Sequence, residues 1–449
     1  MKILHYTLGF PPYRTGGMTK YCIDTALTQK ENGHKVGILW PGEINPLLKQ
    51  KIRKRKNWNG IENYEIVNPL PVALDEGIIE TEKYMEAGDA AIYSQFLDEF
   101  QPDVIHIHTL MGLYKELLDE AEKKGIKTIF TTHDYYGICP KVTLFHHGEN
   151  CTDDDCKECA LCNKTAMSLK KIMILQSLPY RICKDTKIVK KMRQIHRKKF
   201  FNAELNEKNS VPAYYTNPCQ VEKYKKLRQF YLDMLNSVSM IHFNSSVAEE
   251  VYGHYIKHQN TFTMPITHRN ILDKRVIRAY NAGILKIVYL GPQKAFKGFQ
   301  TLLDAMDELW NSGEHGFILK IYNGVDINKP YAVYKSSSYS YDQLPEIFDD
   351  ADLLVAPSVW HETFGFTVLE ALSFGVPVVV SENVGAKDLF VGPMKKMIIK
   401  PQKDALIEIV EELILDRTKL VDCNNCICKD LSLPSINDYM GLYKRVIKC

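Results

Sequence analysis

The sequence lacks the features that mark several classes of protein. No apolar run approaches the ~20 residues that a membrane-spanning helix needs, and the apolar stretch after Met1 is too short for a signal peptide. Basic and acidic residues nearly balance, 57 against 54, whereas a typical nucleic-acid binder carries a strong positive charge. We therefore expect a cytoplasmic globular protein that does not bind nucleic acid. It would act on a soluble molecule or on a membrane from its cytosolic side.

Cysteine is too scarce for a disulfide scaffold, with 12 residues among 449. Five of the cysteines nevertheless lie between Cys139 and Cys162. In a reducing cytosol, clustered cysteines favour metal ligation over disulfide bonds. The spacing C-x4-C-x2-C-x2-C can hold a tetrahedral zinc ion or an iron–sulfur cluster. We interpret four residues as a candidate structural zinc site, with unligated thiols as the alternative: Cys151, Cys156, Cys159 and Cys162.

Signals for strands and helices alternate along most of the chain, which predicts parallel sheets covered by helices. Residues 136–235 interrupt this alternation with the cysteine cluster and a long basic stretch, so we interpret them as a Cys-rich and basic helical insertion. A second α/β region starts near Leu285. We expect an N-terminal domain over 1–270, a C-terminal domain over 271–434, and a final helix over 435–449 that returns to the N-terminal domain.

Two doubly wound, Rossmann-like domains in tandem place the carboxyl ends of two sheets opposite each other. Ligands of such sheets bind outside those ends, so the cleft between the domains is the expected site. In the most informative stretch, a buried strand ends near Ala356, a loop holds Glu362 and Gly365, and a helix begins near Phe366. The free N–H groups at such a helix N-terminus bind anions, and the glycine lets a phosphate approach the backbone.

Glu362 and Glu370 are the two acidic residues of this stretch. Eight helical steps span about 12 Å, whereas the acid and the nucleophile of a glycosidase lie about 5 to 9.5 Å apart. We therefore favour two groups that bind neighbouring hydroxyls over a glycosidase pair. For either residue alone, the alternative is a solvated position on the loop or on the helix face.

The pattern Glu362-x7-Glu370, preceded by Pro-Ser and followed by Ala-x3-Gly-x-Pro, resembles the large retaining glycosyltransferase family with the GT-B fold (glycosyl transferases group 1, family 4). Three further elements resemble the same family, and the one that begins with His133 is similar to the family's capsule and exopolysaccharide branch. These elements are the segment from Gly291 to Gly298, the pair Gly16-Gly17, and the string His133-Asp-Tyr-Tyr-x2-Cys-Pro140.

The resemblance implies a nucleotide-sugar donor, a glycan or polyprenyl-linked sugar acceptor, and no cofactor for catalysis. It implies that Glu370 binds the ribose hydroxyls, that Glu362 holds hydroxyls of the donor sugar, and that Lys297 neutralises the leaving diphosphate. It also implies that His133 faces the donor sugar or the acceptor. The backbone around the phosphates would come from Gly16, Gly17, Phe364, Gly365, Phe366 and Thr367.

One position departs from the family's pattern. Pro292 stands where the family has a phosphate-binding arginine, so one charge-assisted hydrogen bond is lost. Lys294 is the nearest substitute, with a solvated surface role as its alternative. A second hypothesis is therefore a catalytically weak, nucleotide-sugar-binding subunit that partners another transferase. A zinc-ribbon nucleic-acid module and a nucleotide-sugar epimerase fit the motifs less well.

Two basic runs lie in the N-terminal half of the chain. Residues 163–200 contain twelve basic residues against one acid, with apolar residues between them, and a second run covers 49–56. Basic amphipathic surfaces favour anionic membranes by about 1 kcal/mol for each close Lys or Arg. We expect a lipid-linked acceptor at the cytosolic face of the inner membrane, in surface polysaccharide biosynthesis. The alternative is a solvated helical face.

Overall fold

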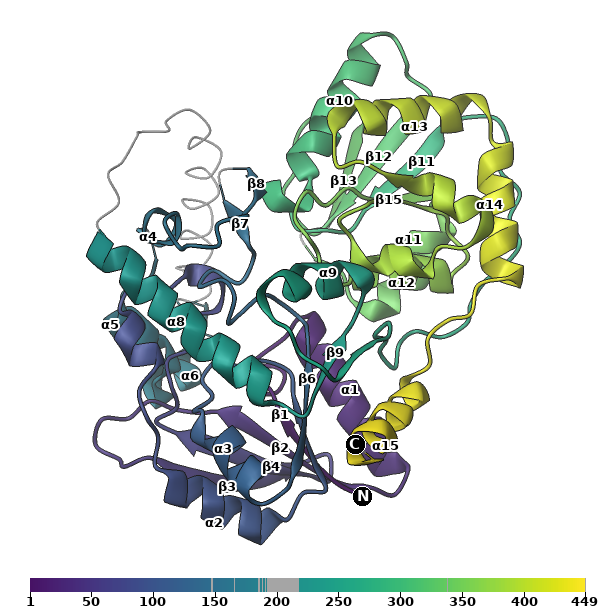
Figure 1. Cartoon of the computed structure of the whole chain (residues 1–449). Coiled ribbons are helices and arrows are strands. Elements are labelled where there is room, and N and C mark those ends of the chain that lie inside the picture. The colour runs from purple at the N-terminus through teal and green to yellow at the C-terminus, as the bar shows by residue number, and fades with distance from the viewer. Residues whose placement is uncertain are drawn as a thin grey trace.

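The computed structural model describes residues 1–146, 148–164, 166–184, 186, 187, 189, 191, 218–336 and 338–448. It contains two α/β domains, each built around a sheet of its own (Figure 1). Helices cover these sheets, whose strands are nearly all parallel. This arrangement confirms the predicted α/β fold class with two doubly wound domains.

The N-terminal sheet has eight strands in the order β10-β9-β6-β5-β1-β2-β4-β3. Its core is formed by buried apolar residues of these strands and of the helices that cover them. The elements outside the insertion are β1 (Lys2–Tyr6), α1 (Gly17–Glu31), β2 (Lys35–Pro41), β3 (Lys51–Trp58), β4 (Ile61–Val67), α2 (Ala90–Phe100), β5 (Val104–Ile107), α3 (Glu116–Lys123), β6 (Lys127–Thr131), β9 (Met240–Phe243), α9 (Ser246–Tyr255) and β10 (Thr261–Thr263).

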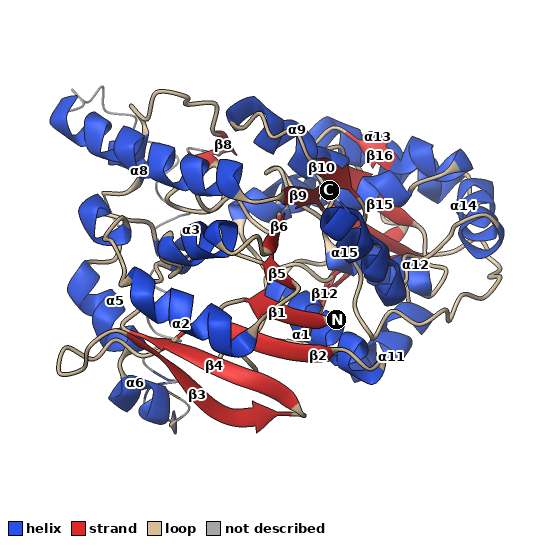
Figure 2. Ribbon diagram, turned by 60° about the horizontal axis from the view of Figure 1, so that its bottom comes forward, coloured by secondary structure: helices blue, strands red, loops and turns tan. Residues whose placement is uncertain are grey.

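The edge strand β3 differs from the expected parallel sheet, because it pairs with β4 as an antiparallel hairpin (Figure 2). Its sequence, KIRKRKNW, is mostly basic and has no alternating apolar pattern, and acidic side chains of neighbouring segments pair with part of it. Arg53 lies 2.6 Å from Glu43 and 2.9 Å from Glu65, and Lys54 lies 2.7 Å from Glu62. Part of the second basic run is therefore neutralised within the sheet.

The insertion between β6 and β9 contains a short hairpin and several helices. Arg228 is buried, and its guanidinium donates to the carbonyl oxygens of Ile138, Asp153 and Asp154 at 2.9 to 3.0 Å, which holds the cysteine-rich loop against α8. Residues 165, 185, 188, 190 and 192–200 of the long basic run lie outside the described residues. The described elements are β7 (Phe145–His146), β8 (Glu149–Asn150), α4 (Cys159–Cys162), α5 (Leu169–Gln176), α6 (Leu178–Cys183) and α8 (Pro218–Ser237).

The C-terminal sheet has six parallel strands in the order β13-β12-β11-β14-β15-β16. Its central strands are apolar and buried on both faces, as expected for a sheet between two layers of helices. Its elements are β11 (Leu285–Tyr289), α10 (Phe299–Asn311), β12 (Phe317–Tyr322), β13 (Ala332–Ser336), α11 (Leu344–Asp349), β14 (Leu353–Ala356), α12 (Phe366–Ser373), β15 (Val378–Ser381), β16 (Ile398–Ile399), α13 (Lys403–Leu415) and α14 (Thr418–Lys429).

The last helix, α15 (Tyr439–Lys448), lies beside α1 in the N-terminal domain (Figure 1). Leu442, Tyr443 and Val446 recur at helical spacing and are buried against the N-terminal sheet, where they contact Ile3 and Ile129. The chain therefore joins the domains at two places, after β10 and after α14. Across the described residues, no helix is long and apolar enough to cross a membrane.

Candidate active site

The loop after β14 carries an ion pair at the carboxyl end of the C-terminal sheet. Glu362 Oε1 lies 2.7 Å from Lys297 Nζ, and the two side chains are 21% and 18% exposed. Lys297 ends a short helical turn, and its ammonium lies 4.9 Å from the centre of the Trp360 ring. Partial burial reduces screening by water, so this pair interacts more strongly than an exposed pair of the same geometry.

Helix α12 begins directly after this loop. Gly365 is its N-cap, with a φ of +101°, and no side chain caps the helix. A Cβ at Gly365 would approach Val384 to 2.9 Å, so both the backbone conformation and the space require glycine. Phe366 packs across the domains against Gly17, where an added Cβ would lie 3.2 Å from the ring. The anion site predicted at the backbone N–H groups that begin this helix stays a prediction.

Glu370 lies in the second turn of α12 and is only 3% exposed. Its Oε1 lies 3.3 Å from Nε2 of His268, which belongs to the segment that joins the two domains. Within the part of the chain that the structure describes, Glu370 Oε2 and His268 Nδ1 have no hydrogen-bond partner. A buried carboxylate oxygen without a partner is destabilising. The arrangement therefore suits a ligand hydroxyl that supplies the missing hydrogen bond.

His133 follows β6 at the carboxyl end of the N-terminal sheet. Its Nε2 lies 3.2 Å from Nδ1 of His108, and its ring centre lies 5.0 Å from that of Tyr21. Burial, together with the nearby His242, lowers the pKa of His133 to about 3, so the ring is neutral at neutral pH. Burial also raises the pKa of the adjacent Asp134 to about 6.

Hydrogen bonds join the two domains between these groups. The Thr363 hydroxyl donates to the carbonyl oxygen of His133 at 2.9 Å. The Ser245 hydroxyl, at the start of α9, donates to the carbonyl oxygen of Thr363 at 2.5 Å. Because Thr363 directly follows Glu362, these bonds hold the loop after β6 beside the loop after β14. The structure thus brings the backbone of His133 in one domain next to Thr363, the residue after Glu362, in the other.

The β7–β8 hairpin of the insertion contacts the same loop of the C-terminal domain. Asn150 Nδ2 donates to the carbonyl oxygen of Val359 at 3.0 Å, and Asn150 Oδ1 accepts the N–H of His361 at 3.0 Å. We call this pair of bonds the insertion clasp. Trp360 lies between the two clasped residues, and its ring packs edge-on against Tyr135 at 6.2 Å. The insertion therefore helps to position the residues before Glu362.

Two regions of the chain match glycosyltransferase families. Residues 333–427 match the family model for glycosyl transferases group 1, and this region includes Glu362 and Glu370. Residues 15–150 match the family model for glycosyltransferase family 4, and this region includes Gly16, Gly17 and His133. No curated protein matches the chain significantly.

Solved structures share the fold over the full length. Sucrose-phosphate synthase from Thermosynechococcus elongatus has a TM-score of 0.56 at 14% identity, with 99% of both chains covered. HepE from Anabaena, solved with UDP, has a TM-score of 0.58 at 12% identity, with 99% of this chain and 100% of its own covered. WaaG, a glycosyltransferase involved in lipopolysaccharide biosynthesis, has a TM-score of 0.52 at 12% identity, with 99% and 98% covered. The chain is a GT-B glycosyltransferase.

In this glycosyltransferase, the carbonyl oxygen of Pro292 accepts a hydrogen bond from the Tyr289 hydroxyl at 2.8 Å. Lys294 Nζ lies 3.4 Å from Asp75 of the N-terminal domain, and its side chain is 42% exposed. The lysine therefore contacts the other domain, and its role in donor binding stays a prediction. Gly16 has a φ of +114° and directly precedes Gly17, and Thr367 lies in the first turn of α12; their roles in donor binding stay predictions.

The four cysteines of the expected zinc site do not gather around one point. Among the described residues, the one group of three or more potential metal ligands lies elsewhere in the N-terminal domain. Cys156 and Cys159 are hydrogen-bonded to each other, and Arg228 Nη2 lies 3.7 Å from the Cys159 sulfur. Cys151 and Cys162 lie at other points of the same loop. Metal binding by the four cysteines stays a prediction.

The sequence motifs do not identify His268 or Asn150. His268 stands 102 residues before its partner Glu370, in a segment where the strand and helix pattern lapses, so the sequence offers no signal for it. Asn150 lies in the cysteine-rich loop, where the cysteine spacing dominates the pattern. Both residues act through contacts between distant segments, which a motif within one segment does not encode.

Proposed function

We propose that this GT-B glycosyltransferase transfers a sugar from a nucleotide-sugar donor to a glycan or polyprenyl-linked sugar acceptor, with retention of the anomeric configuration. One observation carries the proposal, namely the order of groups along α12. The Lys297–Glu362 ion pair precedes the uncapped N-terminus, and the buried Glu370 follows it. A nucleoside diphosphate-sugar carries its groups in the same order, with the sugar first, the diphosphate next and the ribose last.

Each group of the donor has a chemically matched partner in this order. Glu370 Oε2 accepts a ribose hydroxyl, which supplies the hydrogen bond that this buried oxygen lacks in the described structure. The N–H groups at the start of α12 bind the diphosphate, where the helix dipole favours negative charge. The Anabaena HepE structures with UDP and with UDP-glucose support this type of donor, since that protein shares the fold.

The reaction breaks the bond between the anomeric carbon and a phosphate oxygen, and it forms a bond to the acceptor's hydroxyl oxygen. The sugar passes through an oxocarbenium-like state while negative charge grows on the leaving diphosphate. Lys297 and the N–H groups of α12 stabilise that charge. We propose front-face transfer, in which the acceptor's proton passes to the leaving phosphate oxygen. Retention then needs no base from the protein, and the neutral His133 positions hydroxyls by hydrogen bonding.

We assign the acceptor to the N-terminal domain, because His133 lies there and the donor groups lie in the other domain. A polyprenyl-linked acceptor in surface polysaccharide biosynthesis suits the basic stretch of the insertion, which would face an anionic membrane at its cytosolic side. The shared fold of WaaG, which is involved in lipopolysaccharide biosynthesis, supports this assignment. Pelleting with anionic vesicles at low salt tests the membrane part, and failure to pellet would contradict it.

Thermal unfolding with UDP, GDP, ADP, CMP and their sugars tests the donor site, with Glu370→Ala as the comparison. A ligand at 100 times its Kd stabilises the folded state by about 2.7 kcal/mol. We expect one nucleotide to stabilise the wild type and not the variant. No shift with any nucleotide would contradict the donor assignment, and an inverted linkage in the product by NMR would contradict retention.

Pro292 favours a second candidate function. It offers no N–H or charge at the position where the family has a phosphate-binding arginine. A nucleotide-sugar-binding subunit that supports another transferase would tolerate this loss, because binding needs less charge stabilisation than transfer. Nucleotide-sugar binding without turnover of any acceptor would select this candidate over the transferase.

A further inference from the structure

A continuous chain of hydrogen bonds, most of them buried, runs from His133 through the core of the N-terminal domain. It links side chains of β1, α1, β5, β6, β9 and α15, and it ends at the carbonyl oxygen of Met264. Each contact measures between 2.6 and 3.2 Å. We call this chain the histidine relay, and its members in order are His133, His108, His5, Gln29, Tyr443, His106, Thr131 and His242.

The five histidines of the relay are neutral at neutral pH. Burial lowers the pKa of His5 and His242 to about 4 and that of His133 to about 3. Burial also lowers the pKa of His106 and His108. A neutral imidazole carries one N–H donor and one acceptor nitrogen. The position of the proton on one ring therefore decides the position of the proton on the next.

The Met264 end fixes the direction of the chain. A carbonyl oxygen can only accept, so His242 donates from Nε2 at 2.8 Å. Its Nδ1 is then an acceptor and receives the Thr131 hydroxyl at 3.0 Å. The Thr131 oxygen accepts Nε2–H of His106 at 2.7 Å, and His106 Nδ1 accepts the Tyr443 hydroxyl at 2.6 Å.

Gln29 continues the same direction toward His133. Because the Tyr443 proton is already donated, its oxygen accepts the Gln29 amide N–H at 2.9 Å, and the amide oxygen accepts Nε2–H of His5 at 2.8 Å. His5 Nδ1 then accepts from His108 at 3.0 Å, and His108 Nδ1 accepts Nε2–H of His133 at 3.2 Å. Each link donates in one direction, so the bonds polarise one another.

We propose that the histidine relay holds His133 in its Nε2–H tautomer and thereby presents Nδ1 as a hydrogen-bond acceptor for a sugar hydroxyl. The assignment of the hydroxyl rests on the proposed function, whereas the tautomer follows from the relay itself. The opposite tautomer would present an N–H, which cannot accept that hydroxyl proton. His108 and His5 are positioning residues, since they act through His133.

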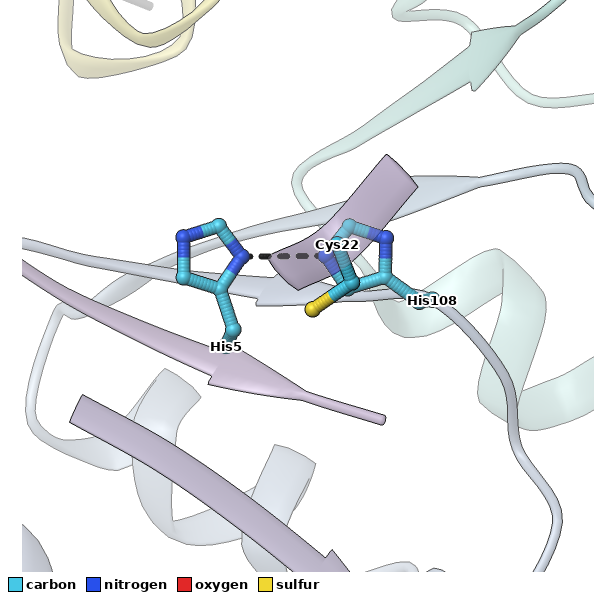
Figure 3. A group of neighbouring side chains, drawn as sticks. All are labelled: His5, Cys22 and His108. Carbon is cyan, nitrogen blue, oxygen red and sulfur yellow. Dashed lines mark hydrogen bonds between the residues drawn. The ribbon is translucent and has the colours of Figure 1, made fainter. Parts of the chain in front are cut away.

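Two members of the relay also belong to a potential metal site. His5 Nδ1, His108 Nε2 and the Cys22 sulfur lie within 4.8 Å of one another (Figure 3). A bound metal would take the lone pairs of both ring nitrogens, and it would move the His108 proton to Nδ1 and reverse the tautomer of His133. We favour the relay because the two nitrogens are already hydrogen-bonded at 3.0 Å. Burial also raises the pKa of the Cys22 thiol, which disfavours the thiolate that a metal needs.

NMR of the full-length protein labelled with 15N-histidine tests the tautomer, since protonated and unprotonated ring nitrogens have well-separated shifts. The spectrum of His133→Gln assigns the His133 signals. We expect the proton on Nε2 of His133, in protein without nucleotide. A proton on Nδ1 of His133 would overturn the relay, and so would a bound metal ion that the variant Cys22→Ala loses. This measurement tests the His133 tautomer directly, and its result does not depend on whether the protein transfers sugar.

The variants His108→Asn and His108→Leu test the positioning role. Asparagine keeps an oxygen near the place of Nδ1 that can accept Nε2–H of His133, whereas leucine cannot accept it. We expect His108→Leu to mix the His133 tautomers and to lower kcat about tenfold, which corresponds to about 1.4 kcal/mol. We expect His108→Asn to keep the single tautomer and most of kcat. Equal loss in both variants would overturn the positioning role, and thermal shifts with nucleotide report separately on the donor site.

Discussion

Lys297 and Glu362 in the C-terminal domain form an ion pair at 2.7 Å, whereas His133 in the N-terminal domain is neutral and bonded to a second neutral imidazole. Hydrogen bonds of Thr363 join the loop that carries Glu362 to the loop that carries His133. Their difference follows from burial, because a charge in the N-terminal core would lose its hydration without a partner. Charge thus lies on the side proposed for the leaving diphosphate, and neutral hydrogen bonds lie on the side proposed for the acceptor.

The largest expected effect comes from removing the charge on the C-terminal side. Loss of one group that stabilises developing negative charge lowers kcat by about a hundredfold to a thousandfold, so we expect Lys297→Ala to fall in this range. Lys329→Ala is the matched control, since Lys329 forms an ion pair of the same 2.7 Å length with Asp307 in the same domain. Equal kcat values for the two variants would show that the Lys297 charge does not act in transfer.

A smaller effect is expected at the ribose end of the same side. A hydrogen bond to a charged group contributes about 1.5 to 3 kcal/mol, so Glu370→Gln should raise the KM for the donor about tenfold to a hundredfold and change kcat less. Glu308→Gln is the control, because Glu308 pairs with Lys403 on the surface of the same domain. Donor titrations measure both constants, and a change in kcat alone would contradict a role in donor binding.

The buried neutral histidines of the N-terminal domain predict that the free energy of unfolding depends on pH. The folded-state pKa values of His5 and His242, about 4, lie below the unfolded value of 6.5. The unfolded chain therefore binds more protons between pH 6.5 and 4, and stability falls as the pH decreases through this window. One pKa unit corresponds to about 1.4 kcal/mol, so His5 and His242 together give a loss on the order of 7 kcal/mol.

Urea unfolding at several pH values measures this loss. His242→Asn removes one of the buried histidine rings and should make the pH dependence shallower, whatever its effect on stability at neutral pH. Identical slopes for the variant and the wild type would contradict the assignment of the acid sensitivity to the buried histidines.

The sequence predicts the parts of the fold and site that lie within one segment. The strand, loop and helix around Glu362 and Gly365 follow from the order of apolar residues, glycine and proline, and the positive φ of Gly365 shows why glycine is needed there. The edge strand β3 is not predictable in this way, because its charges have no apolar period. Its pairing depends on Glu43 and Glu65, which lie on other segments.

Contacts between distant segments account for most of what the sequence does not predict. The partners of His106 and His108 come from α15, β1, β6 and the loop after β6, so the relay emerges only from the topology. The partner of Glu370 is a histidine on the segment between the domains. The cysteine spacing fits zinc, yet spacing alone does not determine whether four sulfurs converge, and a buried arginine occupies part of that loop.

The smallest predicted effect concerns the insertion clasp, which links the two sides. Asn150→Ala removes two hydrogen bonds to the loop before Glu362. A typical hydrogen bond contributes about 0.5 to 1.5 kcal/mol, so we expect kcat/KM to fall about twofold to tenfold through looser positioning of that loop. Asn150→Asp is the control, because its carboxylate still accepts the N–H of His361 and loses only the bond to Val359. We therefore expect it to lie between the wild type and Asn150→Ala. If both variants transfer sugar like the wild type, the clasp does not position the charged side.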